Sequence, residues 1–132
     1  MAQSEGTRRA SEESFQKVFR FSPIAFSITT LDEGRFIDVN AAFENRYGYS
    51  RDELIGRTVH EVAIWDDPAD RALMIAQLNK GGQVRNIITR IHTKSGEIKI
   101  ITYSADRIQF KGTPCVLAVS EEIIRLDPHQ SN

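Results

Sequence analysis

The chain contains 132 residues, of which 40% are hydrophobic and 27% are charged, and its formal net charge is −1 at pH 7. This length predicts one domain with a single core, and the near-neutral charge gives no overall field that would attract nucleic acid or an anionic membrane. The single cysteine excludes an internal disulfide, and no apolar run approaches the roughly 20 residues of a transmembrane helix. The polar N-terminus lacks the hydrophobic region of a signal peptide, and we expect a cytoplasmic protein.

The first elements of the chain are a polar segment and an amphipathic helix. Residues 1–10 carry too little apolar surface to pack, and we expect them to be mobile. A helix is predicted to begin at Ser11 and to end at Ser22, because the residue before Pro23 avoids the helical region. Its apolar residues repeat with helical spacing: Phe15, Val18 and Phe19. This face can cover the domain's own core or contact a second copy, and the sequence leaves both open.

A β-hairpin and a short helix come next. The segments 24–31 and 35–39 are rich in β-branched and aromatic residues and flank the turn sequence Asp32-Glu33-Gly34. Asn40 is a suitable N-cap for the following helix, and Gly48 ends that helix at a position that tolerates a left-handed backbone.

Three further helices are predicted from their N-terminal capping patterns. Ser50–Glu53 and Thr58–Glu61 are capping boxes, in which two side chains each bind the other residue's backbone amide. They predict two short helices, the second of which ends near residue 64. A longer helix over 68–80 begins after Asp67, its predicted N-cap, with proline at the first helical position.

The last third of the chain is rich in β-branched residues. Strands are predicted over 84–93, 98–108 and 115–120, with turn sequences at 94–97 and 110–114. Three strands joined by short turns form an antiparallel meander. The order of helix, two strands, short helices and three strands predicts an α+β domain and leaves the arrangement of the strands open.

Two motifs in the middle of the chain give it a family resemblance. The segments 38–43 (DVNAAF) and 48–56 (GYSRDELIG), in this order and spacing, resemble the PAS domain, an S-box type sensory module of bacterial signalling proteins. Weaker matches occur at Ser22-Pro23, residues 65–71 and Lys94-Ser95-Gly96.

The resemblance implies a fold and a division of the chain. The expected PAS-like fold is a five-stranded antiparallel sheet of order 2-1-5-4-3, with short helices packed on one face and an N-terminal amphipathic helix. The expected division is a mobile segment 1–10, a single PAS-like domain over 11–124, and a tail 125–132 that leads to an output region.

No set of residues predicts a catalytic centre or a metal site. His60 and Glu61 are adjacent in sequence, and neighbours on a helix do not face each other. The chain has no nucleophile elbow, phosphate-binding glycine loop or metal-binding motif, so we expect neither an enzyme nor a metalloprotein. One alternative is a small stand-alone enzyme on a cone-like α+β fold, for which Asp38 and Asp106 are the only strand acids to nominate. Another is a purely structural interaction domain with a filled core.

The resemblance also implies which cofactors to consider. Haem-binding PAS domains place an axial histidine on the long helix, where this chain has none, so haem is not expected. Light-oxygen-voltage domains need a reactive cysteine in an Asn-Cys-Arg-Phe-Leu motif, and the corresponding residues 56–60 contain none, which excludes cysteinyl-flavin photochemistry. Cys115 lies in an apolar strand and is predicted to be a small buried residue. Another small molecule remains open, and Trp65 either stacks on its ring or fills the core.

Ligands of PAS domains lie between the helices and the sheet. Residues from the helices and, by period-two alternation, from the strands are candidates for the lining: Phe26, Ile28, Phe43, Tyr47, Leu54, Trp65, Met74, Ile75, Leu78, Ile87, Thr89, Ile91, Ile101 and Tyr103. The same residues would equally form a filled core.

The opposite face of the sheet predicts a contact with a partner. Ile98 and Ile100 alternate with the candidate pocket residues and therefore point away from the helices. Paired isoleucines on such a face suggest a cover, and together with Phe15, Val18 and Phe19 they predict a homodimer contact.

The expected function is therefore that of a sensory module, which detects a small ligand or a partner and mediates dimerisation within a larger signal-transduction protein, such as one of a two-component system. The parent chain's output would be a histidine kinase, a cyclic-dinucleotide enzyme or a transcription regulator. The last strand of PAS domains usually ends in Asp-Ile-Thr, and Glu122-Ile123-Ile124 occupies this place here. Glu122 and Ile123 are thus the expected signal exit.

Overall fold

The structure is a computed structural model, which describes the backbone of residues 2–125 and the side chains of residues 12–123. Its elements are α1 (Ala2–Phe21), β1 (Ala25–Thr30), β2 (Phe36–Val39), α2 (Ala41–Tyr47), α3 (Arg51–Leu54), α4 (Pro68–Asn79), β3 (Val84–His92), β4 (Ile98–Phe110) and β5 (Thr113–Arg125). Among the described residues, no helix is long and apolar enough to cross a membrane.

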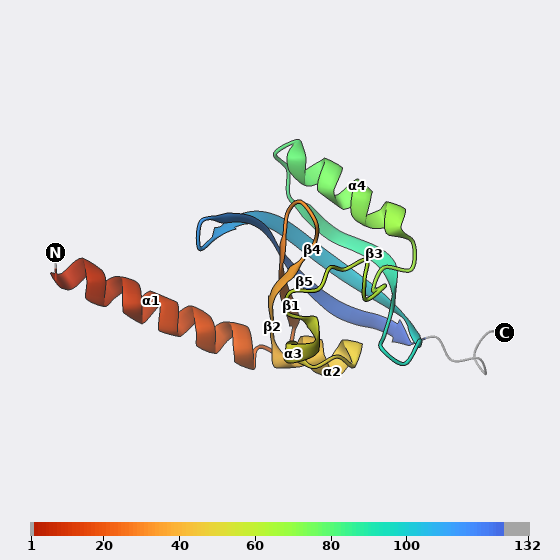
Figure 1. Ribbon diagram of the computed structural model, residues 1–132, viewed down its shortest axis with the longest axis horizontal. Coiled ribbons are helices and arrows are strands. Elements are labelled where there is room, and N and C mark those ends of the chain that lie inside the picture. Colours follow the sequence, from red (N-terminus) through yellow and green to blue (C-terminus); the bar gives the residue numbers. More distant parts are fainter. Residues whose placement is uncertain (1, 126–132) are drawn as a thin grey trace.

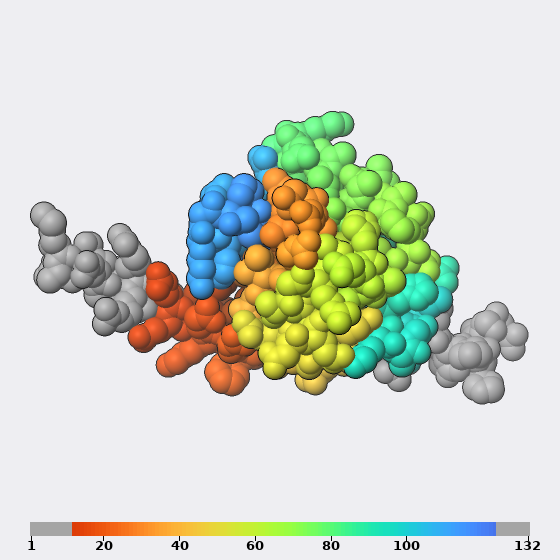
Figure 2. Space-filling view, viewed as in Figure 1, coloured from red at the N-terminus to blue at the C-terminus, as the bar shows by residue number. Residues whose placement is uncertain are grey.

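The five strands form one antiparallel sheet in the order β2-β1-β5-β4-β3, which confirms the predicted fold class (Figure 1). We call the face toward α2, α3 and α4 the inner face and the opposite one the outer face. In the space-filling view, the segment from α2 to α4, drawn from yellow to green, covers the sheet on this side (Figure 2). The C-terminal end of helix α1 adjoins the sheet, and its N-terminal end points away from the domain (Figure 1).

Asn40 fixes the start of α2 against β1. Its side-chain oxygen accepts hydrogen bonds from the Phe43 amide at 3.0 Å and the Phe26 amide at 2.9 Å. Its amide nitrogen donates to the Ile24 carbonyl at 2.8 Å. Asn40 is fully buried, so this cap both starts a helix and joins it to a neighbouring strand. The predicted N-cap is therefore confirmed, as is the left-handed Gly48 at the other end of α2.

The other capping patterns have different outcomes. Ser50 and Glu53 form both bonds of a capping box at the start of α3, and Asp67 caps α4, as predicted. Thr58 and Glu61 also form both bonds, but the helix predicted over 58–64 was wrong. This segment stays a series of turns, because the Val59 amide bonds the Gly34 carbonyl of the hairpin and Ala63 adopts a positive φ of 54°.

Both ends of the domain extend further than the sequence predicts. The helix α1 begins at Ala2 and not at Ser11, and β5 continues to Arg125 and not only to Ser120. The mobility expected for residues 1–10 stays a prediction, as do the domain limits of 11 and 124. The rest of the expected tail 125–132 lies outside the described residues.

Each face of the sheet has its own hydrophobic core. The larger core fills the space between the inner face and α2–α4 and includes Phe43, Leu54 and Leu78. The smaller core lies on the outer face, where Phe19 of α1 covers Ile28 and Cys115. Cys115 is fully buried, as predicted. The sheet is thus covered on both sides, but α1 shields only part of its outer face.

Candidate functional site

A cavity of about 70 Å³ lies in the larger core, between α2, α4, the 58–65 loop and the inner face of the sheet. A water molecule occupies about 30 Å³ of liquid, so the space suits two waters or a molecule of about three to five heavy atoms. Its lining combines aromatic and aliphatic side chains with several polar groups: Ser27, Thr29, Phe36, Phe43, Tyr47, Val59, Ile64, Trp65, Arg71, Met74, Ile91, Ile101, Tyr103, Val116, Ala118 and Ser120.

The structure brings part of the predicted lining to this cavity: Phe43, Tyr47, Trp65, Met74, Ile91, Ile101 and Tyr103. Other predicted residues belong to the same core without bordering the cavity: Leu54, Ile75 and Leu78. Thr89 donates a hydrogen bond to Asp70 of α4 at 2.9 Å, and Ile87 is 38% exposed beside a bulge in β3.

Phe26 and Ile28 were assigned to the wrong face of the sheet. Both belong to the core under α1 on the outer face, with Phe26 packed against the ring of Phe19. The alternation along β1 is as predicted, but it is Ser27 and Thr29 that border the cavity. The prediction assumed that the more apolar set faces the helices, whereas α1 gives β1 a second apolar environment.

Two tyrosines place hydroxyl groups at the cavity. The Tyr47 hydroxyl lies 3.0 Å from Ser120 Oγ of β5, and burial raises its pKa above the ordinary value. Burial and the nearby charge of Asp70 raise the pKa of Tyr103 to about 12. Both side chains are therefore neutral phenols at physiological pH and can donate a hydrogen bond. Trp65 packs edge-on against Tyr103, with ring centroids 5.5 Å apart.

The predicted signal exit is joined to the wall of the cavity. Lys99 is only 5% exposed, and its Nζ lies 3.0 Å from Glu122 Oε1 and 3.1 Å from the Arg46 carbonyl. Arg46 in turn donates to the Ser120 carbonyl at 2.5 Å. These bonds hold the end of β5 to α2, the helix that carries Tyr47. Ile123 is 46% exposed and is free to meet another surface.

The two described histidines and the strand acids Asp38 and Asp106 do not converge on the cavity. His60 is exposed, and His92 Nε2 lies 2.5 Å from Asp66 at the surface. Asp38 is buried and pairs with Arg51 at 2.7 Å, while Asp106 accepts a hydrogen bond from Gln83. Asp38 and Asp106 lie on the outer face, three strands apart, which is about 14 Å. In the described part of the chain, no three His, Cys, Asp or Glu side chains could share a metal ion.

The residues predicted to contact a partner differ in exposure. Val18 is 62% exposed, Phe15 is 39% exposed, and Ile98 and Ile100 are half-buried. Phe19 is not available for such a contact, because its ring is buried against the outer face. Two further apolar residues were missed: Phe21, at 84% exposed, and Ile88 of β3, at 66% exposed on the outer face.

Comparisons with known proteins agree with this architecture. Residues 23–123 match the family model described as PAS domain, and no curated protein matches the chain. A PAS domain of an HTR-like protein from Haloarcula marismortui superposes with a TM-score of 0.68 at 21% identity, covering 93% of this chain and 100% of that one.

Two other solved structures share the fold at low identity. A domain of a sensory box sensor histidine kinase/response regulator from Geobacter sulfurreducens gives a TM-score of 0.67 at 20% identity, covering 84% of this chain and 93% of its own. The PAS domain of a LuxR-family transcriptional regulator from Burkholderia thailandensis, in complex with ethanol, gives 0.66 at 12% identity, covering 83% of this chain and 96% of that one.

Proposed function

The chain belongs to the PAS domain family, and from this premise we propose that it is the sensory module of a larger, cytoplasmic signal-transduction protein, without catalytic activity of its own. The fold shared with a domain of a sensor histidine kinase supports an output domain in the same parent chain. The output domain could also be a cyclic-dinucleotide enzyme or a transcription regulator. The shared fold with a PAS domain of a LuxR-family regulator supports the transcription regulator.

The observation that carries the proposal is the cavity between the helices and the inner face. Its volume of about 70 Å³ is far below the about 300–1,000 Å³ of pockets for drug-sized ligands. We therefore propose neither haem nor flavin as its ligand, and the lack of a histidine on α4 to bind haem iron supports this choice. We propose a ligand of about three to five heavy atoms. The PAS domain that was solved with ethanol offers a precedent for such a size.

The route from this ligand to the output runs through α2 and β5. A ligand beside Tyr47 competes for the hydroxyl that now bonds Ser120, two residues before Glu122. Loss of that bond changes how α2 holds the end of β5 through Arg46 and Lys99. A ligand shifts such an equilibrium only if it binds the two arrangements with different affinity.

A titration followed by NMR tests this proposal. The ¹⁵N-labelled protein is titrated with small anionic, cationic and neutral molecules of about three to five heavy atoms. At least one class is expected to shift the backbone amide signals of Tyr47, Ile101 and Ser120, while Gly112 in the distant β4–β5 turn stays unchanged. If no class of molecule moves the cavity signals, the protein is a module with a filled core and the sensory proposal fails.

We further propose that the module dimerises through its outer face and α1. Val18 and Phe21 of α1 and Ile88 of β3 are more than half exposed, which is costly for apolar side chains unless a partner covers them. Dimerisation would also bring the output domains of two parent chains into one assembly, where they could respond together.

A further inference from the structure

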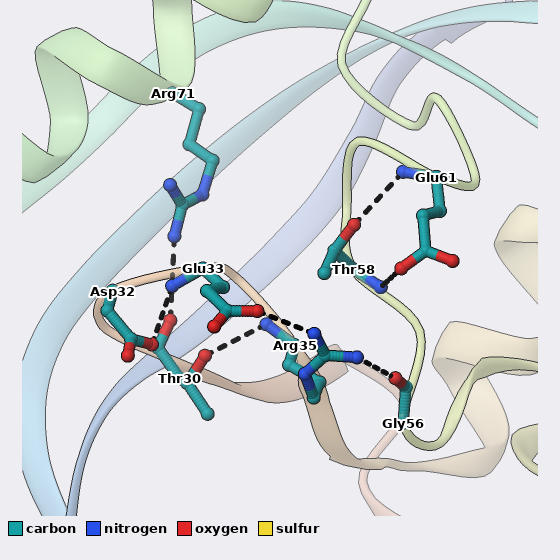
Figure 3. Close-up of polar contacts among 8 residues, drawn as sticks. All are labelled: Thr30, Asp32, Glu33, Arg35, Gly56, Thr58, Glu61 and Arg71. Atoms are coloured by element: carbon teal, nitrogen blue, oxygen red, sulfur yellow. Dashed lines mark hydrogen bonds and ion pairs between the residues drawn. The ribbon is translucent and has the colours of Figure 1, made fainter.

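Arg71 is the one cationic side chain among the described residues that line the cavity. It lies on α4 three residues before Met74 and seven before Leu78, so all three share the buried face of the helix. Only 7% of its surface is exposed. Figure 3 shows the side chain reaching from α4 toward the β1–β2 hairpin.

The Arg71 guanidinium has few partners for a buried charge. Its Nη2 lies 3.5 Å from both the Thr30 and the Leu31 carbonyl oxygens, at the outer limit of a hydrogen bond. Its other N–H groups bond no acceptor among the described residues, and it forms no ion pair with them. None of these nitrogen atoms is fully buried, so their N–H groups stay accessible to a small molecule. Asp32 acts on it only through its charge, because its carboxylate accepts from the Glu33 amide at the exposed end of the hairpin. Burial lowers the pKa of Arg71, but a guanidinium stays charged at physiological pH.

A glycine makes room for this charge. Gly34 in the hairpin has a positive φ of 70°, and a Cβ atom there would lie 2.9 Å from Arg71 Nη2 and 2.8 Å from Val59 Cγ2. Any larger residue would displace the guanidinium from the rim of the cavity. The hairpin thus receives the guanidinium but gives it no ion pair, only the more distant charge of Asp32.

We propose that the cavity selects a small carboxylate, whose oxygens bind Arg71 and the hydroxyl groups beside it. This inference rests on the proposed function, because it names the class of ligand for the same cavity. A buried guanidinium is stabilised most by a carboxylate, with which it forms charge-assisted and often bidentate hydrogen bonds. Thr29 and Ser27 of β1 border the same space and offer further donors. The volume suits an anion of acetate size, with the methyl group toward the aromatic side chains.

Acetate and acetamide provide the test, since they are nearly identical in shape and differ in charge. Binding of each to the ¹⁵N-labelled protein is followed by NMR at constant ionic strength, including the side-chain Nε–Hε signal of Arg71. Acetate is expected to bind about tenfold to a hundredfold more tightly than acetamide and to shift the Arg71 signal. Arg71→Gln removes this preference, while Arg107→Gln, at an exposed arginine outside the cavity, retains it.

Equal binding of acetate and acetamide, or full acetate affinity in a folded Arg71→Gln variant, overturns the carboxylate assignment and leaves the sensory proposal standing. Arg71 then only stabilises the packing of α4 against the hairpin. If neither molecule, nor any other of that size, moves the cavity signals, the sensory proposal itself fails. If Arg71→Gln does not fold, the acetate preference of the unmodified protein and the shift of its Arg71 signal decide the question.

Discussion

Ala118 and Ala105 are direct cross-strand neighbours on the inner face of the sheet, yet only Ala118 borders the cavity. Ala105 is 5% exposed and lies within the packed part of the core. Replacing each of them by valine adds the same volume and the same preference for a strand. The difference between the two variants therefore reports whether free space is present at each position.

Ala118→Val is expected to raise the free energy of unfolding by up to about 1 kcal/mol, because the added methyl groups fill empty space. Ala105→Val is expected to lower it by about 1–3 kcal/mol through overpacking. Urea unfolding of the two variants and the unmodified protein measures both values. Ala118→Val should also weaken the binding of any cavity ligand. Equal destabilisation by both substitutions would mean that the space beside Ala118 is already filled.

Single residues also show how far the sequence predicts the site. The helix residues at the cavity, such as Phe43 and Met74, follow from their apolar spacing. The face of β1 did not follow, because both faces of that strand are buried and hydrophobicity alone does not choose between Ser27 and Ile28. Arg71 was missed, although its spacing from Met74 places it on the buried face of α4. A charged residue on an otherwise apolar helix face is the sequence feature that could have predicted a polar group at the cavity.

The helices and strands were more predictable than the lining of the cavity. Caps and turns are local, so the starts of α2, α3 and α4 are legible in the sequence around Asn40, Ser50 and Asp67. The failure at Thr58–Glu61 is instructive, because the capping box forms there without a helix. The Val59 amide bonds the Gly34 carbonyl of the hairpin, and Ala63 adopts a positive φ, so tertiary contacts override the local preference.

The capping box of α3 also joins two elements, which leads to a pH-dependent prediction. The Glu53 carboxylate accepts the Ser50 amide and pairs with Lys94 after β3. The hydrogen bond from Lys94, and then that from the Ser50 backbone, lowers the pKa of Glu53 from 4.5 to about 2. A lowered pKa in the folded state stabilises the protein above pH 4.5, and this contribution is lost as the pH falls toward 2.

Glu53→Gln should therefore make the free energy of unfolding fall less steeply between pH 5 and 2. The slope gives the number of protons taken up on unfolding, and we expect it to decrease by up to about one proton. Urea unfolding at a series of pH values measures this slope. Asp52→Asn is the matched control, because Asp52 is the adjacent exposed carboxylate of α3 and has no hydrogen bond or ion pair among the described residues. An unchanged slope in Glu53→Gln, or an equal change in Asp52→Asn, would contradict the role of the Lys94 pair.

At the scale of the whole molecule, the two faces of the sheet differ in how they are covered. The inner face holds the large core and the cavity, whereas among the described side chains Phe19 is the one from α1 that is buried against the outer face. Ile98, Ile100 and Ile88 lie on the part of the outer face away from that contact. A stable protein interface buries about 800 Å² on each partner, which a second copy's α1 and sheet together could provide.

Ile88 and Leu73 allow a controlled test of this interface. They are 66% and 68% exposed, but Ile88 lies on the outer face and Leu73 lies on α4. In sedimentation equilibrium over about 1–100 µM, the unmodified protein and Leu73→Lys are expected to be dimers, while Ile88→Lys raises the dissociation constant at least about tenfold. The reason is that a lysine charge in an apolar contact loses its hydration without gaining a partner.

Dimers in all three, which Val18→Glu dissociates, would place the contact on α1 alone. A monomer throughout this range for the unmodified protein would refute dimerisation by this module and leave ligand binding as its function.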